Sequence, residues 1–178
     1  MFSPKMQVSR PITDKVKESL FSVLYKYDLP GGKMVADLFS GVGSLGLEAL
    51  SRGADFVTFV EQDQKIIATL KKNIEKSGFV KESKVIRADA FNVGAPINEK
   101  EYDLIFVDPP YARTSDVGQD SPLSRLMDVL QCQVVPDGIV VVRANRSTVL
   151  LERYGVLQII DRRKWGTMAV TILQKTSE

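Results

Sequence analysis

The sequence predicts an α/β fold in which a mainly parallel sheet is covered by helices on both faces. Two observations lead to this prediction. Short apolar segments of strand length alternate along the chain with segments whose apolar residues recur at helical spacing. The last two apolar segments, 157–162 and 168–174, are separated by too few residues for a crossover connection. We therefore expect parallel strands joined by helices, followed by one antiparallel hairpin.

The first element is a helix over about 14–27. Thr13 is a suitable N-cap, because its hydroxyl can accept a hydrogen bond from the first turn. An apolar stripe at helical spacing follows it, formed by Val16, Leu20, Val23 and Leu24. The Pro-Gly-Gly run at 30–32 ends this unit.

Strands and helices alternate after this point. Gly53 and Gly78 end two of the helices, because glycine adopts the left-handed conformation common at helix C-termini. Residues 112–121 have the composition of a loop. We expect strands over 34–39, 56–61, 84–88, 104–107, 139–143, 157–162 and 168–174. We expect helices over 45–52, 65–77 and 123–130, and a short helix near 149–154.

The composition is that of one ordinary globular domain. The chain has 178 residues, 44% of them hydrophobic, and no apolar run approaches the ~20 residues that a membrane span needs. The start has no signal-peptide pattern, and the single Cys132 excludes an internal disulfide, so we expect a protein of the reducing cytoplasm without a membrane partner. Cys132 follows a helical pattern and is expected to be buried. The absence of histidine excludes imidazole bases and histidine-bound metals, and we expect no metal site.

The net charge of +2 is unevenly distributed. Residues 1–33 sum to +3 and 143–178 to +4, whereas the central 34–142 sum to −5. Basic ends around an acidic centre are expected of a protein that binds a polyanion at its rim, although solvated surface charge gives the same pattern. The sharpest basic cluster is the triplet at 162–164 beside Trp165.

The most informative motif is the corner Asp108-Pro109-Pro110-Tyr111, which ends an apolar strand. Proline lacks an N–H and fixes φ, so the two prolines stop the strand and leave carbonyl groups outside the ladder. The corner carries a carboxylate, a carbonyl and an aromatic ring. Such a set suits a planar base with an exocyclic amino group, because two acceptors take its N–H groups while the ring stacks on its face. A plain turn after a strand is the alternative.

A glycine-rich loop follows the first strand, with Asp37 before Gly41, Gly43 and Gly46. Glycines let the backbone turn tightly and approach a ligand closely. With Glu61, twenty residues after Gly41, they match the dinucleotide fingerprint. Asp37 would repel a pyrophosphate but attract an ammonium, and no hydride-transfer partner is evident. A ligand with an ammonium and a sulfonium therefore suits the loop better, and Glu61 can bind the ribose hydroxyls of either ligand.

Asp89, Ala90 and Phe91 follow the third strand. In a parallel sheet they would lie at the same carboxyl edge as the first two strand ends, where open α/β sheets bind ligands. Asp89 can accept a hydrogen bond from an adenine amino group, and Phe91 can pack near the ring. A lone aspartate after a strand is otherwise a turn residue.

These motifs resemble those of the Rossmann-like S-adenosylmethionine-dependent methyltransferases over essentially the whole chain. The resemblance implies a methyltransferase sandwich: a seven-stranded, mainly parallel sheet with the last strand antiparallel and helices on both faces. It also implies a single methyltransferase domain over 1–178, with a helical segment on the substrate side over 1–30 and the catalytic core over 31–178.

More narrowly, the segments Arg10–Phe21 and Asp37–Ala54 are similar to the bacterial small-subunit (16S) rRNA guanine-N2 methyltransferase family. That family usually has a basic, glycine-containing segment before the motif at Arg10, where this sequence has residues 1–9. The resemblance implies methylation of the exocyclic N2 of a guanine in small-subunit rRNA. It implies S-adenosylmethionine as cofactor, ribosomal RNA or an assembling small ribosomal subunit as partner, and a monomeric cytoplasmic enzyme.

The resemblance assigns roles residue by residue. The catalytic residues would be Asp108, Pro109 and Tyr111. The cofactor-binding residues would be Asp37, Phe39, Gly41, Gly43, Glu61, Gln62, Asp89 and Ala90. The substrate-binding residues would be Pro110, Arg10, Arg113, Arg146 and Arg163.

Two other functions fit the same residues less well. One keeps the cofactor but changes the acceptor to an adenine in DNA or RNA or to a protein glutamine amide, although these acceptors more often go with Asn at the position of Asp108. The other is a cofactor-binding RNA module or an NAD-binding protein without methyl transfer.

Overall fold

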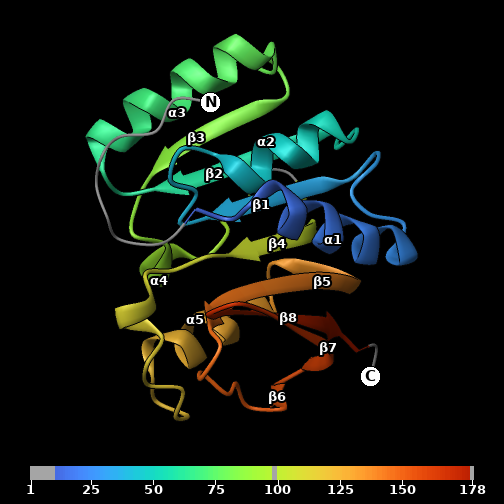
Figure 1. The fold of residues 1–178 in the computed structure, drawn as a ribbon, viewed down its shortest axis with the longest axis vertical. Coiled ribbons are helices and arrows are strands. Elements are labelled where there is room, and N and C mark those ends of the chain that lie inside the picture. The colour runs from blue at the N-terminus through green and yellow to red at the C-terminus, as the bar shows by residue number, and fades with distance from the viewer. Residues whose placement is uncertain (1–10, 98–99, 177–178) are drawn as a thin grey trace.

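The computed structural model describes residues 11–97 and 100–176, which form one mixed sheet with helices on both faces (Figure 1). The strands are β1 (Met34–Leu38), β2 (Phe56–Glu61), β3 (Ser83–Arg87), β4 (Tyr102–Val107), β5 (Val134–Asn145), β6 (Arg153–Tyr154), β7 (Leu157–Trp165) and β8 (Met168–Lys175). The helices are α1 (Asp14–Leu24), α2 (Ser44–Ser51), α3 (Gln64–Ser77), α4 (Ala90–Val93) and α5 (Pro122–Leu130), with 3₁₀ turns over Tyr25–Tyr27 and Tyr111–Arg113.

In these residues the sheet has eight strands in the order β3-β2-β1-β4-β5-β8-β7-β6. Strands β1 to β5 run parallel, as predicted, because each is followed by a helical or long connection. The predicted terminal hairpin is confirmed: β8 pairs antiparallel with both β5 and β7. The sheet thus has one strand more than the seven expected.

The additional strand replaces the helix predicted near 149–154, and that prediction was wrong. Arg153 and Tyr154 form β6 and pair antiparallel with β7. Gly155 at φ 56° makes the tight turn between the two strands. Of the apolar residues that suggested a helix, Leu150 and Tyr154 pack in one buried cluster, whereas Val149 is exposed.

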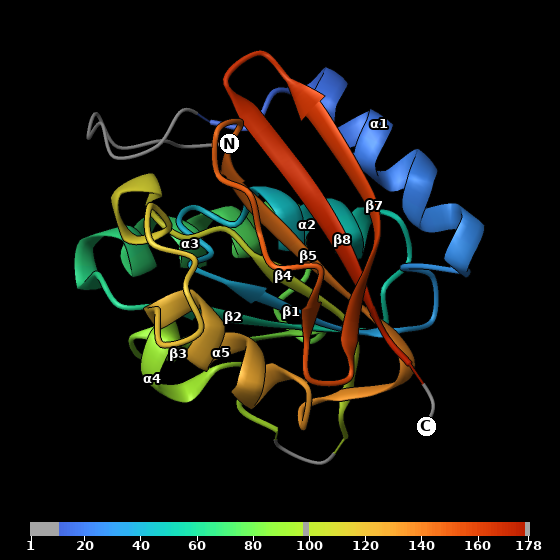
Figure 2. The same ribbon diagram turned by 90° about the horizontal axis from the view of Figure 1, so that it is seen from below.

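Two apolar clusters fix the helices on opposite faces of the sheet. Figure 2 shows the helices on these two faces from below. One cluster joins α1, α2 and α3 to the sheet, and Phe21 of α1 lies 5.8 Å from Phe106 of β4 between ring centroids. The other joins α5 and the start of α4 to the opposite face. Adjacent residues of β4 point to different clusters, so the strand is buried on both sides.

The helix ends follow the sequence signals. Thr13 caps α1, its Oγ1 accepting from the Val16 N–H at 3.4 Å, and Gly78 ends α3 with φ 79°. Cys132 is a correction, because it is exposed rather than buried. It follows the end of α5 in the turn to β5 and so no longer belongs to the apolar face of that helix. Among the described residues, no helix combines the length and apolar character that crossing a membrane requires.

Gly46 carries a packing prediction. A Cβ at this position would lie 2.3 Å from Cε1 of the buried Phe59 ring, so α2 can approach β2 this closely only without a side chain here. We expect Gly46→Ala to destabilise the fold by about 1–3 kcal/mol in urea unfolding. Gly31→Ala is the control, because its Cβ would meet only a carbonyl at 3.9 Å. Equal stability of the two variants would contradict this account.

Candidate active site

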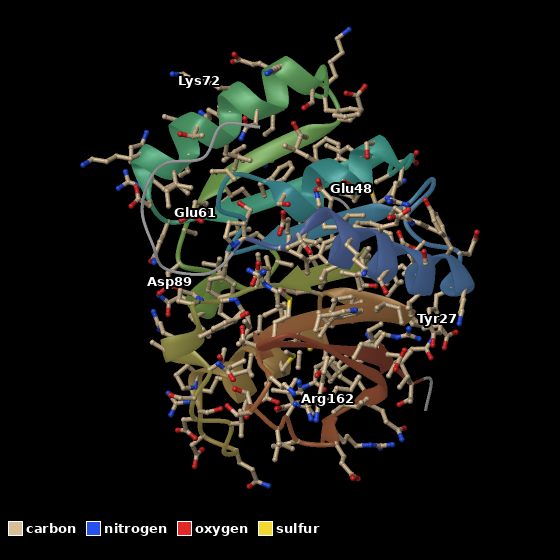
Figure 3. All side chains as sticks on the ribbon, viewed as in Figure 1. Tyr27, Glu48, Glu61, Lys72, Asp89 and Arg162 are labelled. Atoms are coloured by element: carbon tan, nitrogen blue, oxygen red, sulfur yellow. The ribbon has the colours of Figure 1, made fainter. Side chains whose placement is uncertain are left out.

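The carboxyl ends of β1, β2 and β4 bring three acidic residues to one edge of the sheet. In the parallel register, Leu38 pairs with Val60 on one side and with Val107 on the other. Asp37, Glu61 and Asp108 therefore lie on neighbouring strand ends. Figure 3 shows Glu61 and Asp89 at this same end of the sheet. Open α/β sheets bind their ligands at this edge.

The loop between β1 and α2 has the sharp backbone that the glycines predicted. Phe39, Gly41 and Gly43 have φ of 59°, 55° and 91°. The Gly43 N–H donates to the Ser40 carbonyl at 2.8 Å, and Gly43 begins α2 as its N-cap. A Cβ on Gly43 would lie 2.6 Å from Leu70 of α3, whereas one on Gly41 would meet nothing within 4 Å. Gly41 thus leaves open space beside the loop backbone.

Glu61 holds this loop against the end of β2. Its Oε2 accepts from the Gly41 N–H at 2.9 Å, and its Oε1 accepts from the N–H groups of Gln62 and Asp63, each at 2.9 Å. An ionised carboxylate has about four acceptor sites, so three backbone bonds leave room for a ligand hydroxyl. The Gln62 side chain is exposed beside it.

Asp37 is 1% exposed and accepts a hydrogen bond from the Gly46 N–H at 2.8 Å. Burial raises the pKa of Asp37 well above its ordinary value, and the negative charges of Asp108 and Glu61 add to the rise. The bond from Gly46 and the positive charge of Arg143 oppose it. The predicted contact between Asp37 and a ligand ammonium stays a prediction, since the contact seen here is to α2.

Asp89 lies next to an aromatic pair and an arginine. It caps the four-residue α4, where the sequence suggested a loop, and its Oδ1 accepts from the Phe91 N–H at 3.0 Å. The Phe91 ring packs on Phe39 with 4.7 Å between centroids. Arg113 lies over Phe91 at 4.2 Å, and its Nη1 is 3.6 Å from Asp89 Oδ2. Ala90 is buried.

Asp108 forms an ion pair with Arg143 of β5, a residue that the sequence argument missed. Arg143 Nε donates to Asp108 Oδ1 at 2.6 Å, and the two side chains are 4% and 17% exposed. Burial raises the pKa of the Asp108 carboxyl, while the charge and hydrogen bond of Arg143 lower it. A signal was available: one arginine ends the apolar run 139–142, and a buried charge needs a partner.

The residues after Asp108 leave the sheet as a short turn. Pro109 is buried, and Pro110 precedes the 3₁₀ turn Tyr111–Arg113, in which the Arg113 N–H donates to the Pro110 carbonyl at 2.9 Å. Tyr111 is half-buried and packs against the cluster on the α1 face. This corner therefore places Tyr111 and Arg113 on one turn directly after the carboxylate.

The basic residues predicted to bind substrate occupy different places. Arg146 follows β5 and, with Lys164, lines a shallow groove between that strand end and the β7–β8 turn. Arg163 pairs with Asp161 at 3.0 Å. Arg162 donates to the Thr148 carbonyl at 2.6 Å, which ties β7 to the segment after β5. Arg10 lies outside the described residues.

The sheet, with an antiparallel strand between β5 and β7, belongs to a fold that is shared with a solved methylase structure. A solved structure titled "putative methylase" from Haemophilus influenzae is 28% identical and superposes with a TM-score of 0.73 over 92% of this chain and 98% of that one. A conserved hypothetical protein from Streptococcus pyogenes is 25% identical, with a TM-score of 0.77 over 90% of this chain and 95% of that one.

The chain belongs to the family described as Conserved hypothetical protein 95, whose model matches residues 1–174. A relative from Bacillus subtilis, named "Putative rRNA methyltransferase YlbH", is 37% identical over 94% of this chain and 88% of its own length. An Escherichia coli relative, "Ribosomal RNA small subunit methyltransferase D", is 37% identical over 106 residues. That match spans 58% of this chain and half of the relative.

The burial of Asp37 predicts how the stability of the fold depends on pH. Because its folded-state pKa is raised, ionising Asp37 weakens the fold as pH rises from about 4, the ordinary pKa of aspartate, toward the folded value. Asp37→Asn keeps an acceptor for Gly46 and removes this charge. Urea unfolding should show a gain in stability that is absent in acid and grows toward neutral pH. Asp55→Asn, at an exposed position, should change stability by less than about 0.5 kcal/mol at either pH. A loss of stability in Asp37→Asn at neutral pH would refute this.

Proposed function

We propose that this protein transfers a methyl group from S-adenosylmethionine to the exocyclic N2 of a guanine in small-subunit ribosomal RNA. The observation that carries the proposal is the partly buried, arginine-paired Asp108 carboxylate at a Pro-Pro-Tyr corner, one strand away from the glycine loop. The names of the relatives support the reaction and the RNA class. In this proposal the protein acts as a monomer in the cytoplasm. Its substrate is free RNA or an assembling small subunit.

The cofactor would lie along the carboxyl edge of β1, β2 and β3. Glu61 would accept from the ribose hydroxyls with its remaining lone pairs, and Asp89 would accept from the adenine amino group beside Phe91. Gly41 and Gly43 would let the loop backbone approach the ligand, with Phe39 next to them. A cation suits the site because Asp37 and Glu61 are both acidic. When bound, this cofactor supplies an electrophilic methyl group on sulfonium.

The acceptor guanine would be presented out of its base stack, because its amino nitrogen cannot be approached in line while it is paired. Asp108 and the Pro109 carbonyl would accept the two N2 hydrogens and direct the nitrogen lone pair at the methyl carbon. Tyr111 would fix the plane of the base, and Pro110 would line its site. The N2–C bond forms as the S–C bond breaks, and one N2 proton leaves to Asp108 or to water. Positioning of this kind lowers the activation free energy of methyl transfer by several kcal/mol.

The RNA backbone would bind at the basic rim. Arg146 and Lys164 line the groove at the end of β5, on the same sheet edge as Asp108. Arg113, Arg163 and Arg10 would add contacts to phosphate or to the flanking nucleotides. In this arrangement residues 1–30 form the substrate side and 31–178 the catalytic core of one domain.

The reaction is tested by incubating the protein with tritiated S-adenosylmethionine and small ribosomal subunits that lack the modification, followed by digestion of the RNA to nucleosides. Label in N2-methylguanosine is the expected result. Label in another nucleoside, or cofactor binding without label in RNA, would overturn the proposed acceptor. Failure to bind the cofactor would overturn the proposal as a whole.

The roles of two acids can be separated. Asp108→Ala should lower kcat by a factor of about 100 or more while leaving cofactor affinity within a few-fold of wild type. The variant loses the hydrogen bond between the carboxylate and the guanine amino group but no contact to the cofactor. Glu61→Ala should weaken cofactor binding by about 10–100-fold, measured by calorimetry. Equal losses of both quantities in both variants would contradict these roles.

Arg146 carries a prediction on RNA binding. Removing one phosphate contact should lower the magnitude of the slope of log K against log salt by about 1. We expect this for Arg146→Ala in a filter-binding series from low to moderate salt. Lys72→Ala is the matched control, since Lys72 is exposed on α3 and lies far from Arg162 in Figure 3. The same slope for Arg146→Ala and wild type would remove Arg146 from the interface.

A further inference from the structure

Arg143 is a buried arginine placed against the carboxylate of the reaction site. Val142 of β5 pairs in register with Val107 of β4, so the next residue on each strand, Arg143 and Asp108, come side by side. Arg143 Nε is 2.6 Å from Asp108 Oδ1, and the arginine side chain is 4% exposed. The strand residues on either side of it, 139–142 and Ala144, are apolar and buried.

Stability alone does not account for a guanidinium at this position. Desolvating two ions offsets most of their attraction, and apolar side chains of similar volume often replace buried ion pairs without loss of stability. Arg143 replaces what would otherwise be one more apolar residue of the α1-side core. We therefore look for a functional role of Arg143 at the site, where its guanidinium pairs with Asp108.

The surroundings of Asp108 otherwise favour its protonated form. Burial raises the pKa of its carboxyl, and Arg143 is the group that lowers it. The charged and titratable side chains of the elements around it are Asp37 of β1, Glu61 of β2, Arg143 of β5, Tyr111 and Arg113 of its own loop and the Lys17–Glu48 pair between α1 and α2. Arg113 is paired with Asp89. Two of these are acids on neighbouring strand ends, so the charge that favours ionised Asp108 comes from β5.

We propose that Arg143 is a positioning residue that keeps Asp108 ionised, anchors its Oδ1 and leaves Oδ2 to accept from the amino group of the acceptor base. This inference rests on the proposed function. A protonated Asp108 would carry an O–H donor toward the amino nitrogen and would compete for the lone pair that must attack the methyl carbon. An ionised carboxylate offers acceptors only, so it leaves that lone pair free.

The test measures ionisation and transfer separately in wild type, Arg143→Met and Arg143→Lys. Protein carrying ¹³C at the aspartate side-chain carboxyls is titrated by NMR, with Asp108→Asn identifying the Asp108 signal. In Arg143→Met the Asp108 pKa should rise, because the opposing charge is gone. The acid limb of the pH profile for methyl transfer should move the same way. Below neutral pH the rate of methyl transfer by Arg143→Met should fall by roughly tenfold or more relative to wild type. Part of that loss should be recovered at alkaline pH.

Arg143→Lys keeps the charge but not the planar guanidinium, and it covers the case in which the methionine variant does not fold. It should retain an acid limb close to that of wild type, with a lower kcat. In the Asp108→Asn background, adding Arg143→Met should not move the profile, because an amide does not titrate.

An unchanged Asp108 titration in Arg143→Met would overturn the inference, and so would a rate loss in Arg143→Met by one constant factor at every pH. If only Arg143→Lys folds, an acid limb that moves away from that of wild type although the positive charge is kept would overturn it. Absence of guanine methylation by wild type would overturn the proposed function instead, and the NMR titration would still decide whether Arg143 keeps Asp108 ionised.

Discussion

Three carboxylates meet at one sheet edge, and the site depends on how their mutual repulsion is compensated. Asp37 is held by a single N–H of α2, Glu61 by three backbone N–H groups, and Asp108 by the guanidinium of Arg143. Each acid thus has a different partner and a different environment. The neutral backbone dipoles do not cancel the full charge of this edge, so a ligand that carries positive charge gains from binding there. Sulfonium and ammonium groups meet that requirement, and a pyrophosphate does not.

The compensation works only because the backbone approaches closely. Gly46 lets α2 lie against Phe59, and this contact brings the first turn of α2 within hydrogen-bond distance of Asp37. The positive φ at Gly41 and Gly43 turns the loop so that the Gly41 N–H reaches Glu61. Packing of a helix on a strand and the electrostatics of the site are therefore set by the same few small residues.

Much of this arrangement could be predicted from local patterns. Apolar periodicity and glycine positions predicted the strands and main helices to within three residues, except that β5 begins five residues earlier than expected. The short link at Gly166 predicted the terminal hairpin. The segment near 149–154 was misjudged because its apolar spacing fits a helix, while the turn at Gly155 and pairing with β7 decide its structure. Arg143 was missed because its partner is 35 residues away in sequence and becomes a neighbour only through strand register. The roles of the site residues were predicted from motifs, and the structure adds the contacts of each side chain.

The position of β8 has a consequence for how the molecule is made. Seven residues of β5, Ile139 to Asn145, pair with β8, which is the last strand in chain order. Until β8 has emerged during synthesis, the strand that carries Arg143 has an open, valine-rich edge. The order of elements along the chain therefore delays completion of the ion pair's support until β8 has been synthesised, and in that interval this edge is open to pairing with other chains.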